Sequence, residues 1–417
     1  MTVPGAGSRA KPEMMGSRPV LLAAIRARAL RSARRLALST SGLAVKPRAV
    51  QLVSLVLFLL AGASTGYVAA DSAVTGASVG GAAAASQPAA LQPMPPLPSP
   101  HQLPRSELFT FHSDVFLNLH HFLYRWAQAG PGADTSSLDR RIRLRDEDRQ
   151  VHAALSSAER AQWDKAIGYY RLGMIERDLL FDDEMVALRD CLVMAGNFCD
   201  RIAERDQDTL DLLNETMPVF RRHWWERHND ENRAWINVQI PLARAHEAQI
   251  AARVAAAYTG TWLESRNRVD VMVYANQVGG YTTSDGHITV TSIEAGTPDY
   301  LGLELLFHEA SHGDTMERPL RRLIRDSFDA IGAEVPRDLW HMTIFYTAGE
   351  ITRAVLAEAG IDYPQTYAEF AGIFSRREDN IRAKAALDTA WKDALVGRGG
   401  FEEAMRRVAE AWRAAER

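Results

Sequence analysis

The segment LLFHEASHGD, Leu305–Asp314, contains two histidines that flank a glutamate in the pattern H-E-x-x-H. Side chains four residues apart on an α-helix lie on the same face, one turn from each other. His308 and His312 can therefore reach one metal ion through their imidazole nitrogens. Glu309 lies beside the first histidine, where its carboxylate can accept a proton from an attacking water. The pattern predicts a zinc site with His308 and His312 as metal ligands and Glu309 as general base.

The residues around the motif favour a helix that is buried in the protein. Ala310 and Ser311, between the two histidines, are small and leave room for close approach. Four large apolar side chains precede the motif: Leu303, Leu305, Leu306 and Phe307. The alternative is a pair of core histidines, or a His-Glu-His cluster on a helix surface, that matches the pattern by coincidence.

A zinc hydrolase needs a third protein ligand and one open coordination position. The segment Pro336–Gly360 is predicted to form a helix, with proline in its first turn and glycine after its end. Glu350 lies in its middle and follows three small residues, Thr347–Gly349, which would let this helix approach the motif helix closely. We predict Glu350 as the third zinc ligand. The alternative is an ion pair between Glu350 and Arg353 on the helix surface.

Other side chains compete with Glu350 for the role of third ligand. Glu334 precedes Pro336 in a predicted loop. Asp314 is better placed to accept a hydrogen bond from a ligand histidine, through the ring nitrogen that does not bind the metal. His341 lies nine residues before Glu350, about half a helical turn out of phase, so one straight helix cannot offer both to the same ion. The candidates are Glu334, Asp314, Glu317 and His341.

A further role is the stabilisation of the oxyanion that forms when water attacks a carbonyl. Tyr346 lies four residues before Glu350, shares its face and is predicted to donate its hydroxyl to that oxyanion. His341 is a second candidate if its end of the helix bends toward the cleft. The alternatives are a packed aromatic ring and a histidine that is satisfied within the core.

One region of the folded part differs from the helical pattern of the rest. Arg268–Ser292 is dense in Val, Ile, Tyr and Thr and is interrupted by Gly279-Gly280 and by Ser284-Asp285-Gly286. This composition predicts two or three strands with tight turns, directly before the motif helix. The predicted fold class is α+β, a mainly helical domain with a small β-sheet next to the zinc-binding helix.

The predicted domain spans residues 106–417. Helical patterns fill residues 106–265 and 365–417, the strand-rich edge covers 268–292, and the zinc helices lie in 302–358.

This layout resembles the gluzincin branch of the zincin metallopeptidases, in which edge strands precede an HExxH helix and a glutamate follows on a later helix. The resemblance covers about Arg268–Gly360, and the gap from His312 to Glu350 is longer than in the best-known gluzincins. It implies a Zn²⁺ cofactor and a peptide or protein substrate, whose main chain an edge strand would hold. By that resemblance Tyr281 and His287 would lie near the cleft.

The N-terminus carries the pattern of an export signal. The first 48 residues are rich in arginine with Glu13 as the one carboxylate, and residues 49–70 are apolar and uncharged. This segment is predicted to direct the chain out of the cytoplasm, to the periplasm or another extracytoplasmic space. It is either cleaved after Ala70 or retained as an inner-membrane anchor. Residues 71–105 are rich in Ala, Gly, Ser and Pro and are predicted to be a tether.

Charge and cysteine content narrow the remaining function classes. The formal net charge of −4 gives no indication of a nucleic-acid partner, and two cysteines exclude a disulfide framework and a cysteine zinc cluster. Cys191 and Cys199 can pair if the chain turns at Gly196-Asn197, and otherwise they are buried thiols. The alternative function is a non-catalytic cell-envelope binding protein on a zincin-like scaffold, or, more weakly, a helical protein with a structural zinc. The intact Glu309 favours the enzyme.

Overall fold

A computed structural model gives the fold of the part of the chain that follows the N-terminal region. It describes residues 105–129, 144–194, 199–200, 202–262, 266–275, 279–283, 286–293 and 299–415. These residues belong to one compact unit, Pro93–Arg417. The apolar segment 49–70 and nearly all of the tether lie outside the described residues. Among the helices that are described, none is long and apolar enough to cross a membrane.

A small mixed sheet of four strands, in the order β1-β2-β4-β3, lies at the centre of this unit. The strands are β1 (Phe109–His112), β2 (Asn267–Met272), β3 (Gly280–Thr282) and β4 (Ile288–Thr291). β1, β2 and β4 are parallel, and β3 pairs with β4 in the antiparallel sense and forms an edge. The α+β fold class is confirmed, with three strands where two or three were predicted. β1 was not predicted, because a four-residue strand gives too short an alternation to recognise.

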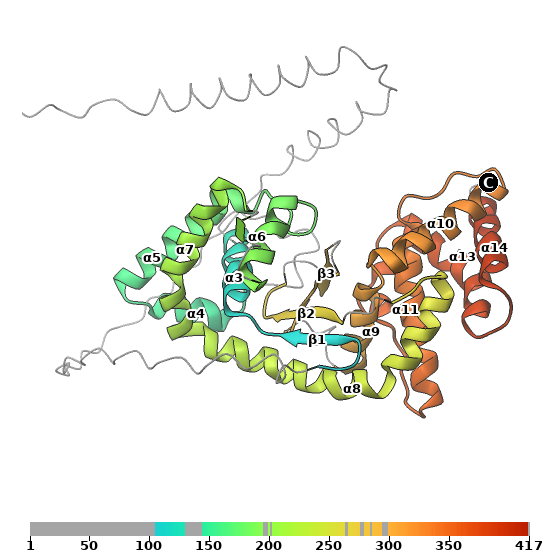
Figure 1. The fold of residues 1–417 in the computed structure, drawn as a ribbon, viewed down its shortest axis with the longest axis horizontal. Coiled ribbons are helices and arrows are strands. Elements are labelled where there is room, and N and C mark those ends of the chain that lie inside the picture. Colours follow the sequence, from blue (N-terminus) through green and yellow to red (C-terminus); the bar gives the residue numbers. More distant parts are fainter. Residues whose placement is uncertain are drawn as a thin grey trace, which may run out of the picture. The chain divides into compact units, whose positions relative to one another are not determined.

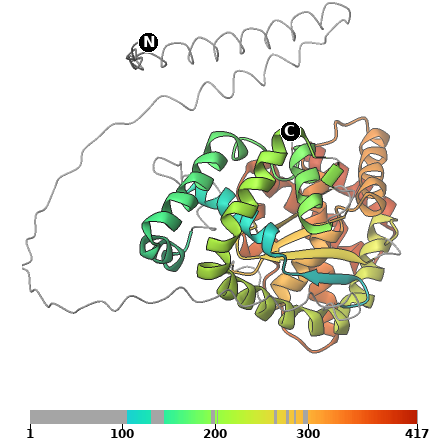
Figure 2. The same ribbon diagram turned by 60° about the vertical axis from the view of Figure 1, so that its left-hand side comes forward.

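Helices lie on both sides of this sheet (Figure 1). The first group is α3 (Val115–Gln128), α4 (Asp146–Ala154), α5 (Ser157–Tyr169), α6 (Asp183–Met194) and α7 (Glu204–Phe220). Two π-helical segments interrupt the helical regularity: η4 (Tyr170–Met174) and η6 (Arg221–Trp225). The second segment joins α7 to the long helix α8 (Glu226–Tyr258), which runs below the sheet in both views (Figures 1 and 2).

The second group of helices holds the motif. It comprises α9 (Asp299–Ala310), α10 (Asp314–Ala330), α11 (Leu339–Glu358), α12 (Tyr367–Phe370), the short 3₁₀ helix η7 (Ile373–Ser375), α13 (Glu378–Leu395) and α14 (Phe401–Ala414). α11 packs against α9 on one side and against α13 on another. Its position between these two helices decides which of its side chains can reach the motif.

The sheet separates two hydrophobic cores. Val269 and Val271 of β2 and Val290 of β4 belong to the core that α8 to α14 complete, whereas Tyr274 and Tyr281 belong to the core of α3 to α7. Tyr281 belongs to the edge strand β3, and Tyr274 follows the end of β2. The sheet therefore lies between the two helical groups, and side chains from it and its flanks belong to both cores.

Cys191 and Cys199 form a disulfide, with their Cα atoms 4.4 Å apart. This separation shows that the two cysteines do not lie on one straight helix, where they would be about 12 Å apart. Residues 195–198, between them, lie outside the described part of the chain.

Gly349, in the middle of α11, allows a close approach to α12 and α9. A methyl group added there would lie 2.8 Å from Cγ2 of Thr366 and 3.0 Å from Oε1 of Glu304. Thr366 caps α12 through its hydroxyl, so its side chain cannot simply rotate away. The small residue is therefore required by packing, although glycine weakens a helix interior by about 1 kcal/mol.

We expect Gly349→Ala to destabilise the protein by about 1–3 kcal/mol, because the cost of overpacking exceeds the gain in helix propensity. The matched control is Gly168→Ala in α5, where the new methyl group has no atom within 4 Å. That variant should gain up to about 1 kcal/mol. Denaturant unfolding of the two variants beside the wild type measures both changes, and equal effects would contradict the packing argument.

Candidate metal centre

The motif begins on α9 and ends beyond it. α9 stops at Ala310, and the following turn is tightened, with His312 N donating to Glu309 O at 3.1 Å and Gly313 N to Ala310 O at 3.3 Å. The sequence predicted one helix through both histidines. The tighter turn nevertheless leaves the two rings together, with Nε2 of His308 and Nε2 of His312 3.4 Å apart.

A third histidine joins this pair from α11. One nitrogen each of His308, His312 and His341 lie within 4.8 Å of one another. His341 is in the first turn of α11, and Phe345, one turn further, stacks on the His308 ring with 3.7 Å between ring centroids. This stacking fixes α11 against the end of α9, so that His341 faces the two motif histidines.

The nitrogen spacing of the two motif histidines fits a zinc ion, and His341 offers a third nitrogen beside them. With Zn–N distances of about 2.0–2.1 Å and tetrahedral angles, two ligand nitrogens lie about 3.3 Å apart, close to the distance observed between His308 and His312. Burial lowers the pKa of His308 well below its usual value, and burial together with nearby positive charge lowers the pKa of His341 to about 3. Both imidazoles are thus neutral at neutral pH, as metal ligands must be. Nδ1 of His308 is buried and has no hydrogen-bond partner among the described residues.

Glu309 lies between this group and the edge strand of the sheet. Its Oε2 accepts a hydrogen bond from Thr282 Oγ1 at 2.8 Å, and its Oε1 is 4.0 Å from Nε2 of His308. Burial raises the pKa of Glu309 above its usual value. A carboxylate with a raised pKa is a stronger proton acceptor, which suits a general base.

The carboxylate that bonds a motif histidine is Glu317, one turn into α10. Its Oε2 lies 3.0 Å from Nδ1 of His312, which leaves Nε2 of that ring free to bind a metal. Burial alone would raise the pKa of Glu317, but its bonds to His312 and Arg321 lower it. The sequence favoured Asp314 for this role. Asp314 instead pairs with Arg318, one turn further along the exposed side of α10.

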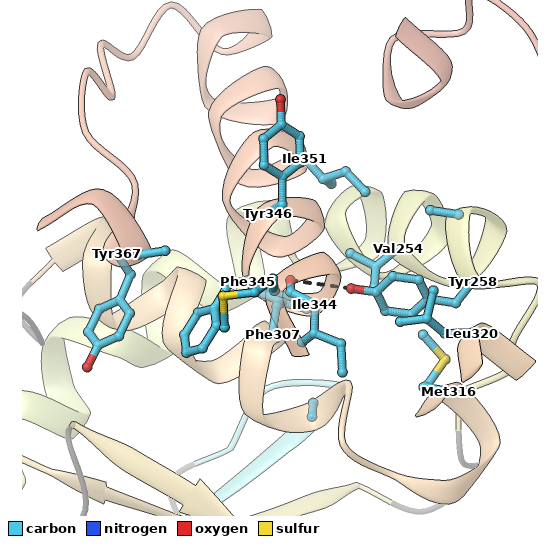
Figure 3. Close-up of a cluster of buried hydrophobic side chains, with 14 of the residues drawn as sticks. Val254, Tyr258, Phe307, Met316, Leu320, Ile344, Phe345, Tyr346, Ile351 and Tyr367 are labelled. Carbon is cyan, nitrogen blue, oxygen red and sulfur yellow. Dashed lines mark hydrogen bonds between the residues drawn. The ribbon is translucent and has the colours of Figure 1, made fainter. Parts of the chain in front are cut away.

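The structure does not bring Glu350 or Tyr346 to the histidines. Glu350 pairs with Arg353, the alternative that the sequence left open, and with Lys392 of α13 at 3.4 Å. The Tyr346 hydroxyl donates to Asp388 of α13 at 2.6 Å, and Figure 3 shows Tyr346 and Phe345 leaving α11 on different sides. Both predicted residues lie on the face toward α13, so His341 replaces Glu350 as the third residue beside the motif.

Tyr281 and His287 contact residues of the first helical group. The Tyr281 hydroxyl lies 3.1 Å from Nε2 of His121, in the core of α3 to α7, and Nδ1 of His287 lies 3.6 Å from Asp190. The alternation of side chains along β3 explains this placement. Thr282 faces Glu309, whereas Tyr281, its neighbour, points to the opposite side of the sheet.

Comparison with protein-family models, with curated proteins and with solved structures gives no match. The interpretation of this centre therefore depends on its own geometry.

The ligand set can be tested by metal analysis of the full chain. We expect about one zinc per wild-type chain, strongly reduced by His308→Ala, His312→Ala and His341→Ala, because each removes one of the three converging nitrogens. Glu350→Gln is the control and should keep its zinc, because that carboxylate is engaged by Arg353 and Lys392. Loss of zinc from Glu350→Gln with retention in His341→Ala would contradict this assignment.

Proposed function

We propose that the chain is a zinc-dependent hydrolase of the zincin type and that it cleaves peptide bonds. One observation carries the proposal: the carboxylate of Glu309 lies between a group of three converging histidines and an edge strand. A base, a metal site and a surface that can hold an extended chain are thus adjacent.

A catalytic zinc site has three protein ligands and keeps its fourth position for water or substrate. The three histidine nitrogens match that number of ligands. Zinc bound by His308, His312 and His341 would supply a Lewis acid that polarises a substrate carbonyl and acidifies water. The protein's contribution is to hold the three rings in place. His308 is held by the stacked Phe345, and His312 is held by Glu317.

Glu309 is suited to take the proton of the attacking water. Thr282 holds one carboxylate oxygen, so the other, Oε1, stays directed toward His308. Because the group is buried, its ionised form is poorly solvated and accepts a proton readily. The same carboxyl group can then pass the proton to the leaving amine, as a general base and acid does in turn.

The edge strand β3 is the reason to propose a peptide rather than a small molecule. Just beyond the two ends of β3, Thr283 N donates to His287 O at 3.1 Å and Thr291 N donates to Gly279 O at 3.0 Å. Tyr281, opposite Thr289, is in the same register, so the odd-numbered residues at 279–283 direct their main-chain groups toward the β4 side. In an antiparallel pair the alternate residues direct their main-chain groups to the other side. Gly280 and Thr282 therefore present donors and acceptors at the edge, where an extended peptide can add as a further strand.

The location of the enzyme belongs to the same proposal. The basic and apolar N-terminal pattern favours export, with residues 49–70 as a cleaved signal or a membrane anchor. The disulfide between Cys191 and Cys199 is compatible with an oxidising compartment outside the cytoplasm.

Glu309→Gln tests the mechanism in the full chain. The variant should keep its zinc and lose hydrolysis of an unfolded protein such as casein by about 10²–10⁴-fold, because the proton acceptor is gone while the ligands remain. Glu350→Gln is the matched control and should keep the wild-type rate. Hydrolysis by Glu309→Gln at the wild-type rate would refute the mechanism. A wild-type protein that binds zinc but cleaves no peptide in a broad library would favour the non-catalytic binding protein.

A further inference from the structure

Arg321, on α10, contacts two groups that lie against histidines of the centre: Glu317 lies against His312, and Trp340 lies against both His341 and His312. Its Nε donates to Oε1 of Glu317 at 2.6 Å, and the other oxygen of that carboxylate lies 3.0 Å from Nδ1 of His312. Its guanidinium carbon also lies 3.5 Å from the centre of the Trp340 ring. Trp340 in turn stacks on His341, with 5.1 Å between centroids and 19° between the planes.

We propose that Arg321 is a positioning residue of the metal centre, which sets the spacing of the His312 and His341 nitrogens through Glu317 and Trp340. This inference rests on the proposed zinc site and adds a function for a residue that contacts none of its ligands directly. One guanidinium group thereby couples a ligand on the turn after α9 to a ligand on α11.

The two connections constrain different properties of the rings. The bond from His312 to Glu317 fixes the tautomer, with the proton on Nδ1 and the lone pair on Nε2, and the orientation of the ring. The stack of guanidinium, indole and imidazole fixes the plane of His341, because a planar cation attracts the face of an aromatic ring. Lysine keeps the charge but lacks the plane and the forked donors, so it cannot serve both connections equally well.

The exposure of this network argues for positioning rather than for general stability. The side chains of Arg321 and Glu317 are 44 % and 20 % exposed, and ion pairs of this kind contribute little to the free energy of folding. The ligand ring that they hold is more buried, at 15 % exposure for His312. Removing Arg321 should therefore change metal affinity more than the stability of the metal-free protein.

The test compares Arg321→Ala with Arg318→Ala in the full chain. Arg318 lies one turn earlier on the same helix, is 73 % exposed and pairs only with Asp314 among the contacts of the described residues. We expect Arg321→Ala to weaken zinc binding about 10–100-fold, measured by competition with a chromophoric chelator. Arg318→Ala should match the wild type, and Arg321→Lys should recover part of the loss.

A second readout separates positioning from folding. The visible absorption bands of bound Co²⁺ report ligand geometry, and they should change in Arg321→Ala and in Glu317→Gln but not in Arg318→Ala. If Arg321→Ala fails to fold, Glu317→Gln carries the test, because it removes only the charge of the intermediate carboxylate. Zinc affinity and Co²⁺ bands equal to those of Arg318→Ala would overturn this inference alone. A wild-type protein that binds neither metal would overturn the proposed function as well.

Discussion

The stacking of Phe345 on His308 determines how α11 meets the end of α9, and the candidate centre depends on that contact. Once Phe345 lies on this imidazole, His341, one turn earlier, faces the same way. The opposite side of α11 then packs against α13, where Tyr346 and Glu350 find their partners. The two sets of side chains lie on different faces of α11, so the packing of one face against α9 leaves the other facing α13.

Much of the fold could be predicted from sequence, because its signals are local. The valines and tyrosines of Arg268–Ser292 and the glycines between them predicted the strands next to the motif helix, as the structure has them. The start of α5 is also encoded locally, since Ser156 and Glu159, three residues apart, form a capping box there. β1 could not be predicted, since four residues carry too little periodicity and its pairing with β2 joins segments far apart in the chain.

The site was predictable where it is local and not where it depends on packing. His308, Glu309 and His312 are adjacent in sequence, and the structure brings them together. The choice between Glu350 and His341 depends on which face of α11 meets α9. Their spacing of nine residues shows only that both cannot face the same metal ion, and it does not show which of them does. The position of Asp314 in the first turn of α10 gave no indication that Glu317 would turn toward His312, because α10 starts only after the chain has bent at Gly313.

The three residues of β3 divide their side chains between two helical cores. Gly280 and Thr282 face α9, and Tyr281 reaches across to His121 on α3. A single peptide unit therefore separates the residue that contacts His121 from the hydroxyl that holds Glu309. Among the described residues, the three histidines of the centre come from the elements after the sheet, while the helices before it contact the same edge strand. β3 thus contacts both helical groups, through Tyr281 on one side and Thr282 on the other.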